Sequence, residues 1–170
     1  EFNGSNYLEL TSVSHSIGTN AFTYEMWYYP TQQLTASGGS GTVIWEEPGY
    51  GGIQIGNVGG GTSWGATFIG EGWIFVSDTY PNLNQWNHIA FVRDGSNTCS
   101  LFLNGTRIAT GTNNTSIPTP STIWIGYNDS WGLNLNGYLS NIRVVNGTAV
   151  YDPTQTSITV PTAPLTAISG

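Results

Sequence analysis

The sequence is short of charge, and above all of basic residues. It has three arginines and no lysine against ten carboxylates, so its net charge is −7. Proteins that hold nucleic acid or an anionic membrane surface electrostatically need a basic patch, which this chain lacks. Its apolar runs are also far shorter than a transmembrane helix requires. We therefore expect neither nucleic-acid binding nor membrane insertion.

Cysteine and histidine are nearly missing as well. Cys99 is the only cysteine, so the chain cannot form an internal disulfide. It lies in the strand-like run TCSLFL, which predicts a buried, unreactive thiol. With only His15 and His88, there is no Cys/His cluster for zinc, and no EF-hand loop for calcium.

Aromatic residues, in contrast, are plentiful. They make up 13% of the 170 residues and include seven tryptophans. Disordered chains lack this apolar content, and the length suffices for one core of good size. Solubility must then come from Ser, Thr, Asn, Gln and Gly, a composition typical of extracellular or particle-surface β proteins.

The apolar residues alternate with period two in short runs that end at Gly, Asn, Pro or Asp, and no segment has a helical period. This spacing predicts an all-β fold, a two-sheet antiparallel β-sandwich or jelly roll. The expected strands are residues 6–10, 21–30, 42–47, 51–58, 64–70, 72–78, 86–95, 98–103, 106–110, 123–127 and 137–145.

The run 21–30 predicts a central strand, because both of its faces are bulky. Phe22, Tyr24, Met26 and Tyr28 alternate with Thr23, Glu25, Trp27 and Tyr29. A carboxylate buried on such a strand needs a partner. The candidates for Glu25 are His88, Arg93 and Arg143, and we interpret the set as a structural network.

Two Asn-Gly-Thr triplets follow apolar runs, at Asn104 and at Asn146. Asn-Gly between alternating runs is the strongest short hairpin signal, because both central residues of a type I′ turn need positive φ. We predict a hairpin at Asn104-Gly105, and turns at Asn146-Gly147 and Asp94-Gly95.

Five stretches occur in a characteristic order: FTYEMWYYP, WNHIAFVRDG, LFLNGTRIA, IGY and GYLSNIRVVNGTAVYD. Together they resemble the laminin-G-like, or concanavalin A-like, lectin/glucanase superfamily, over nearly the whole chain. The resemblance implies two packed, curved antiparallel sheets, which we assign to residues 1–160. Residues 161–170, rich in Pro, Ser, Thr and Ala, predict a linker-like C-terminal tail.

Residues 137–170 are also similar to repeat units of large virion proteins from marine phages. In those repeats an arginine-containing strand leads to NGTA.Y, and PT.PLTA.SG leads into a further domain. The resemblance implies a module of a longer tail or capsid-surface protein. It would be displayed on a virion surface or otherwise outside the cell, with other virion subunits as partners.

Catalysis is not expected. Related folds include retaining glycoside hydrolases, which need two carboxylates on one face, usually from acidic residues at alternate strand positions. No such strand exists here, and the adjacent Glu46 and Glu47 would point to opposite faces. GTSWG at 61–65 matches a nucleophile pattern but sits in a glycine-rich β context and not at a strand-turn-helix elbow.

Sugar recognition pairs exposed aromatic rings with amides and carboxylates. Two loops offer this combination, IGYNDSWGLNLNG and EEPGYGG. The candidate ligand-binding residues are Tyr127, Asn128, Asp129, Trp131 and Asn134 in the first and Glu47 and Tyr50 in the second, with Trp64, Trp73 and Tyr80 as further candidates. We expect Trp27, Trp86 and Trp124 to belong to the core, because they lie in alternating runs.

The laminin-G-like resemblance also implies one calcium ion at the rim of the sandwich, for which Asn3 and Asn141 are the candidate ligands. Both are amides where acids are common in the family, which weakens such a site. The leading hypothesis is a non-catalytic module that binds cell-surface or environmental glycans. The alternatives are a structural capsid or tail decoration domain without a glycan ligand and a jelly-roll glycoside hydrolase.

Overall fold

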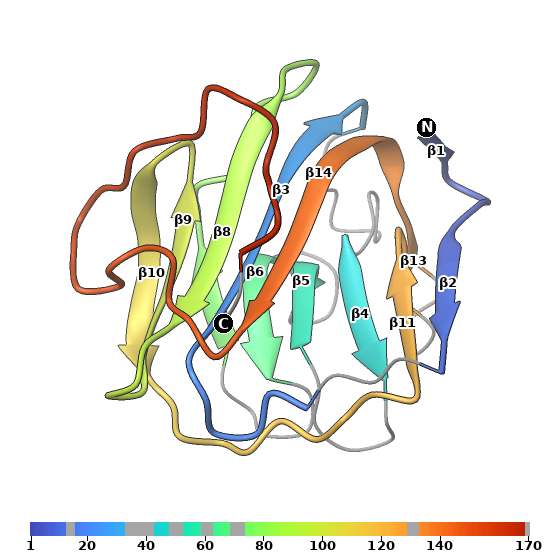
Figure 1. The fold of residues 1–170 in the computed structure, drawn as a ribbon. Coiled ribbons are helices and arrows are strands. Elements are labelled where there is room, and N and C mark those ends of the chain that lie inside the picture. Colours follow the sequence, from blue (N-terminus) through green and yellow to red (C-terminus); the bar gives the residue numbers. More distant parts are fainter. Residues whose placement is uncertain are drawn as a thin grey trace.

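The computed structural model describes residues 1–12, 16–32, 43–47, 53–58, 63–68, 74–128 and 133–168. In this part of the chain there are strands and no helices, so none of it could cross a membrane as a helix. Two six-stranded antiparallel sheets pack face to face, as Figure 1 shows. The predicted all-β sandwich is therefore confirmed.

The first sheet has the order β1-β14-β3-β8-β9-β10 and the second has the order β2-β11-β4-β5-β6-β7, while β12 and β13 form a separate pair. The strands are β1 Phe2–Asn3, β2 Leu8–Thr11, β3 Phe22–Pro30, β4 Ile44–Glu47, β5 Ile53–Val58, β6 Ser63–Phe68, β7 Ile74–Ser77, β8 Asn87–Arg93, β9 Thr98–Leu103, β10 Thr106–Thr112, β11 Thr122–Ile125, β12 Tyr127–Asn128, β13 Leu133–Asn134 and β14 Asn136–Asn146.

Strand β3 is central, as its two bulky faces predict, and pairs with β14 on one side and β8 on the other. Its inward face joins the core between the sheets. The members of that face are Phe22, Tyr24, Met26 and Tyr28, all at most 2% exposed. Cys99 is also in this core, and burial raises the pKa of its thiol to about 12. The predicted burial of the thiol is confirmed.

The hairpin between β9 and β10 turns at Asn104 and Gly105, which have φ of 50° and 82°. These are the two left-handed residues that a type I′ turn requires. At Asp94-Gly95 the connection is longer than a two-residue turn. It extends to Asn97, which is the residue with a left-handed backbone. After β14, Gly147 has φ of 91° and the chain leaves the sheet with no returning strand.

The segment after β14 does not leave the domain but crosses the outer face of the first sheet. In Figure 1 it passes β10 and returns in red over β8 toward β14. Backbone hydrogen bonds attach it to the hairpin turn, where Ile158 N donates to Gly105 O at 2.8 Å. The predicted tail region is anchored too, since Leu165 N donates to Asn141 Oδ1 at 3.2 Å.

Candidate functional site

The outer face of the first sheet carries its side chains in rows across β14, β3 and β8. Strand register places Tyr138 opposite Tyr29, then Trp27 between Ser140 and His88, then Arg143 opposite Glu25. Directly opposed side chains on one face of an antiparallel sheet are neighbours. The face thus changes from aromatic at one end to polar and ionic toward the middle.

The aromatic end is open to solvent. Tyr29 contacts Trp86 edge-on at 5.5 Å between ring centroids, and Tyr138 on its other side at 5.7 Å. Trp86 is 46% exposed and Tyr138 39%. These three rings, which we call the aromatic row, form a cross-strand surface of the kind that contacts the apolar face of a ring-shaped ligand.

A groove of about 750 Å³ adjoins the aromatic row. The rings of Trp27 and Trp86 and the sheet residues Ser140 and Asn141 line one side, and residues 160–164 line the other. The chain thus supplies one wall from the sheet and the other from its own C-terminal segment. The size lies within the range of small-molecule binding clefts, and apolar walls with a few polar groups are typical of them.

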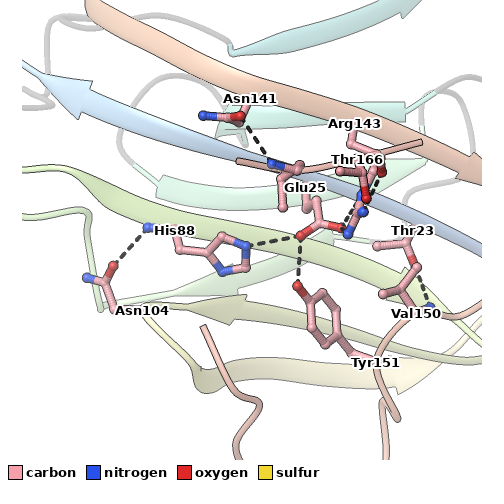
Figure 2. A network of polar contacts seen from close by, with 10 residues as sticks. Thr23, Glu25, His88, Asn104, Asn141, Arg143, Val150, Tyr151 and Thr166 are labelled. Carbon is pink, nitrogen blue, oxygen red and sulfur yellow. Dashed lines mark hydrogen bonds and ion pairs between the residues drawn. The ribbon is translucent and has the colours of Figure 1, made fainter. Parts of the chain in front are cut away.

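Beyond the groove, the C-terminal segment covers a buried carboxylate. Glu25 has no exposed surface and accepts hydrogen bonds from His88 Nε2 at 3.2 Å, Tyr151 Oη at 2.8 Å and Arg143 Nε at 2.8 Å. Arg143 Nη2 makes a second, very short contact with it, and Nη1 donates to Thr166 O at 2.7 Å. Figure 2 shows that these groups converge on Glu25 from both sides.

This network sets the ionisation of its members. Burial alone would raise the pKa of Glu25, but the hydrogen bonds from His88, Arg143 and Tyr151 and the charge of Arg143 outweigh it, so that pKa lies below its usual value. Burial and the bond to Glu25 raise the pKa of Tyr151. Glu25 is thus held as an anion with its lone pairs engaged, as the predicted structural network requires.

Arg93, the third candidate partner of Glu25, faces the other way. Its fully buried guanidinium lies 5.0 Å from the Phe22 ring centroid on the core side of the sheet. It donates to the carbonyl oxygens of Gly18, Asn20 and Thr115. Burial lowers the pKa of Arg93. The expectation that it pairs with Glu25 is wrong, because the period of two in β8 places His88 and Arg93 on opposite faces.

The first predicted sugar loop shares no residue with the aromatic row and contacts Tyr7, next to the edge strand β2 of the second sheet. Tyr127 stacks on Tyr7 with ring centroids 4.7 Å apart, and Trp124 meets it edge-on at 6.1 Å. One face of Tyr127 is therefore already covered. Asn134 is half-buried opposite Tyr127 in the β12–β13 pair, and Asn128 is fully buried. Tyr7, 44% exposed, is the ring that this cluster offers to solvent.

Several other predicted site residues cannot be compared with the structure. Asp129, Trp131 and Tyr50 lie outside the described residues, as does Trp73. Glu47 is the last residue of β4, and its side chain is not among those described. The assignment of these residues to a ligand site stays a prediction.

Burial of the tryptophans differs from expectation at four positions. Trp64, a candidate for ligand contact, is 2% exposed and belongs to the core. Trp86, expected in the core, is exposed. It precedes β8 and lies on the outer face of the sheet. The C-terminal segment covers the middle of that face and does not cover Trp86. Trp27 and Trp124, also expected in the core, are half-buried and lie outside it. The sequence did not reveal the aromatic row, because Trp86 was expected in the core. Tyr29 alternates with the core residues of β3, and this alternation was the signal that could have revealed the row.

The structure does not bring the two candidate calcium ligands together. Asn3 pairs with Asn136, and Asn141 lies five positions further along β14, roughly 16 Å along the strand at ~3.3 Å per residue. Their oxygens are also engaged: Asn3 Oδ1 accepts from Ser5, and Asn141 Oδ1 accepts from Leu165. The described residues contain no cluster of three His, Cys, Asp or Glu that could hold a metal. This pair therefore does not fit one calcium ion.

Known structures share this fold. Domain 4 of an extracellular arabinanase from Geobacillus stearothermophilus, in complex with arabinotriose, matches with a TM-score of 0.67 and 19% identity over 91% of this chain and 72% of that one. A heptameric pentraxin from Limulus polyphemus matches with a TM-score of 0.60 and 17% identity, over 88% and 76% of the chains. Domains LG4–5 of the mouse laminin α1 chain match with 0.61 and 15%, over 84% and 39%.

Sequence comparison gives the family. No curated protein of similar sequence was found. A family model described as concanavalin A-like lectin/glucanases superfamily matches residues 2–151, which include every strand of both sheets and end at Tyr151 beside Glu25. The chain therefore belongs to the laminin-G-like branch of the concanavalin A-like lectin/glucanase superfamily.

Proposed function

We propose that the chain is a non-catalytic carbohydrate-binding module. The observation that carries this proposal is the aromatic row, with Trp86 and Tyr138 exposed side by side with Tyr29 on a rigid sheet. Exposed large aromatic rings are costly to leave in water and favour a ligand with an apolar face. The arabinotriose complex of a domain with the same fold supports a sugar as that ligand.

The environment of Glu25 supports the absence of catalysis. A retaining glycosidase needs a second carboxylate about 5–5.5 Å away and a site open to substrate. The residues opposite Glu25 are Arg143 and Ala90, and its neighbours on the same face are Thr23 and Trp27. Together with its burial, these neighbours make Glu25 a structural anion and not an acid or base for substrate.

A glycan array on the purified domain tests the proposal, with and without a calcium chelator. Binding to a glycan class is the expected result, and Trp86→Ala should reduce it about fivefold or more, because a stacking ring contributes on the order of 1 kcal/mol or above. The variant should keep its unfolding midpoint, since Trp86 is exposed. A blank array would remove the proposal in favour of a decoration domain, and reducing ends released from a polysaccharide would show a hydrolase.

The same array distinguishes the predicted loop from the aromatic row. Tyr127→Ala changes the cluster at the edge of the second sheet and leaves the aromatic row intact. If the loop is the site, Tyr127→Ala loses binding and Trp86→Ala does not. Our proposal expects the reverse. Loss of binding with chelator would show that binding depends on a divalent cation held by residues other than the pair Asn3 and Asn141.

We further propose that the module is displayed on a virion surface. The support is the similarity of residues 137–170 to repeat units of phage virion proteins, together with a surface whose few charges are mostly acidic. Immunogold labelling of intact virions from the source of the sequence, with an antibody against the domain, tests this. Label on tails or capsids is expected, and unlabelled virions would contradict it.

A further inference from the structure

Trp27, Trp86 and residues 160–164 line one groove. We infer that the module binds an uncharged polysaccharide chain in this groove, independently of calcium. Its own C-terminal segment forms half of the site. This inference rests on the proposed function and specifies its ligand. The aromatic row continues the sheet side of the groove through Trp86, so a chain could extend from the groove onto the row.

The charge of the groove argues for a neutral ligand. Its lining residues, as far as the structure describes them, include no ionisable side chain. The nearest ion pair, Glu25 with Arg143, is internally compensated. An acidic sugar would find no counter-charge there and would meet a protein with a net charge of −7. A neutral sugar needs only rings to stack on and polar groups for its hydroxyls.

Those polar groups are present at the groove. Asn141 is exposed, and its Nδ2 donates one hydrogen bond, to Ser140 Oγ at 2.9 Å. An amide nitrogen has two hydrogens, so the second can serve a sugar hydroxyl. Thr162, also exposed, adds a hydroxyl from the opposite wall. Amides and hydroxyls without a carboxylate are a poor set for Ca²⁺, so binding here should not need the ion.

The C-terminal wall is held by specific contacts. Leu165 N donates to Asn141 Oδ1, and Arg143 donates to Thr166 O, so β14 supplies one partner of each of these two hydrogen bonds. At the other end of the wall, just before Val160, Ile158 N donates to Gly105 O at 2.8 Å and attaches the segment to the hairpin turn. The wall is therefore fixed on both sides of residues 161–164 and can define a groove width.

Filling the groove from this wall tests the inference. Ala163 lines the groove and is exposed, so Ala163→Arg should obstruct it without disturbing the fold. Ala167 is also exposed on the same segment but does not line the groove, which makes Ala167→Arg the matched control. In affinity electrophoresis or isothermal titration with a neutral polysaccharide, Ala163→Arg should weaken binding at least about tenfold and Ala167→Arg less than about twofold.

The ligand class is tested with neutral and uronic-acid-containing polysaccharides at low and high NaCl, with and without EDTA. The inference expects the neutral chain to bind equally in all of these buffers, because no ion pair is formed for salt to screen. Binding confined to acidic chains, loss in EDTA, or equal effects of Ala163→Arg and Ala167→Arg would each overturn it. The proposed function would survive any of these results, since it fails only if no glycan binds or if the domain releases reducing ends from a polysaccharide.

Discussion

Glu25 shows how the partners of a single buried carboxylate determine its role in the fold. It is a fully buried carboxylate in a superfamily that includes glucanases, yet His88, Arg143 and Tyr151 occupy its oxygens. Removing one group of a buried ionic network leaves its partners uncompensated. The resulting loss of stability is larger than the stabilisation that the interaction itself contributes.

We therefore expect Glu25→Gln to lower the free energy of unfolding by about 3 kcal/mol. The amide keeps the shape of the side chain but cannot accept from Arg143 and His88 as an anion does. Urea denaturation followed by tryptophan fluorescence measures the change. Glu9→Gln on the exposed strand β2 is the control, with an expected effect within about 0.5 kcal/mol. Equal stability of the two variants would contradict the structural role of Glu25.

The same carboxylate predicts the direction of the acid response. Its pKa is lower in the folded chain than the ordinary value of 4.5. The unfolded chain therefore takes up the proton first, so the stability that Glu25 contributes is complete above about pH 4.5 and is lost as the pH falls toward its folded pKa. Unfolding free energies measured from pH 7 down to pH 3 should fall less steeply for Glu25→Gln than for the parent chain. Parallel curves would show that other carboxylates cause the decline.

At the scale of elements, the hairpin turn of β9 and β10 carries a second task. Gly105 is needed for the left-handed turn, with φ of 82°, and a Cβ there would lie 2.8 Å from Ile158 O. Because Ile158 donates its own amide hydrogen to Gly105 O, the turn is also the attachment point of the C-terminal segment. Gly105 thus connects the first sheet to the C-terminal segment that forms one side of the groove.

Gly105→Ala should consequently destabilise the chain by about 1–3 kcal/mol, from both backbone strain and the displaced segment. Gly95→Ala is the control, because a Cβ there meets no atom within 4 Å and the residue has no positive φ. Thermal unfolding of both variants gives the comparison, and hydrogen exchange at Ile158 reports the segment itself. A loss of stability without faster exchange at Ile158 would mean that only the turn is strained.

The elements were predictable from sequence because their signals are local. Alternation in residues 21–30 and Asn-Gly at Asn104 are read within a few residues, and both predictions are confirmed. The site was not predictable from sequence in this way, because the exposure of Trp86 depends on where residues 149–168 cross the sheet. That crossing joins positions distant in sequence, and a linker-like composition gives no indication of it.

At the scale of the whole molecule, the surface limits how strong binding can be. With three arginines, of which Arg93 is buried and Arg143 is paired, the domain has little positive charge to attract an anionic ligand, and a neutral ligand is not attracted from a distance by charge. Contact is then made through a few rings and amides in an open groove, which favours weak, readily reversible binding by one copy. Useful affinity for a polymer would come from presenting many copies together.

Multivalent display should accordingly raise the apparent affinity by about 10²-fold or more, since a second binding event on the same polymer is intramolecular. Biotinylated domain on tetrameric streptavidin, compared with free domain on a surface coated with neutral polysaccharide, measures the gain by its dissociation rate. A short soluble oligosaccharide, which can engage only one copy, should bind both forms equally. Trp86→Ala should lower the gain by about the factor by which it weakens single-site binding, because avidity multiplies the contact that exists at each site. A gain that persists undiminished in Trp86→Ala would place the contact outside the aromatic row.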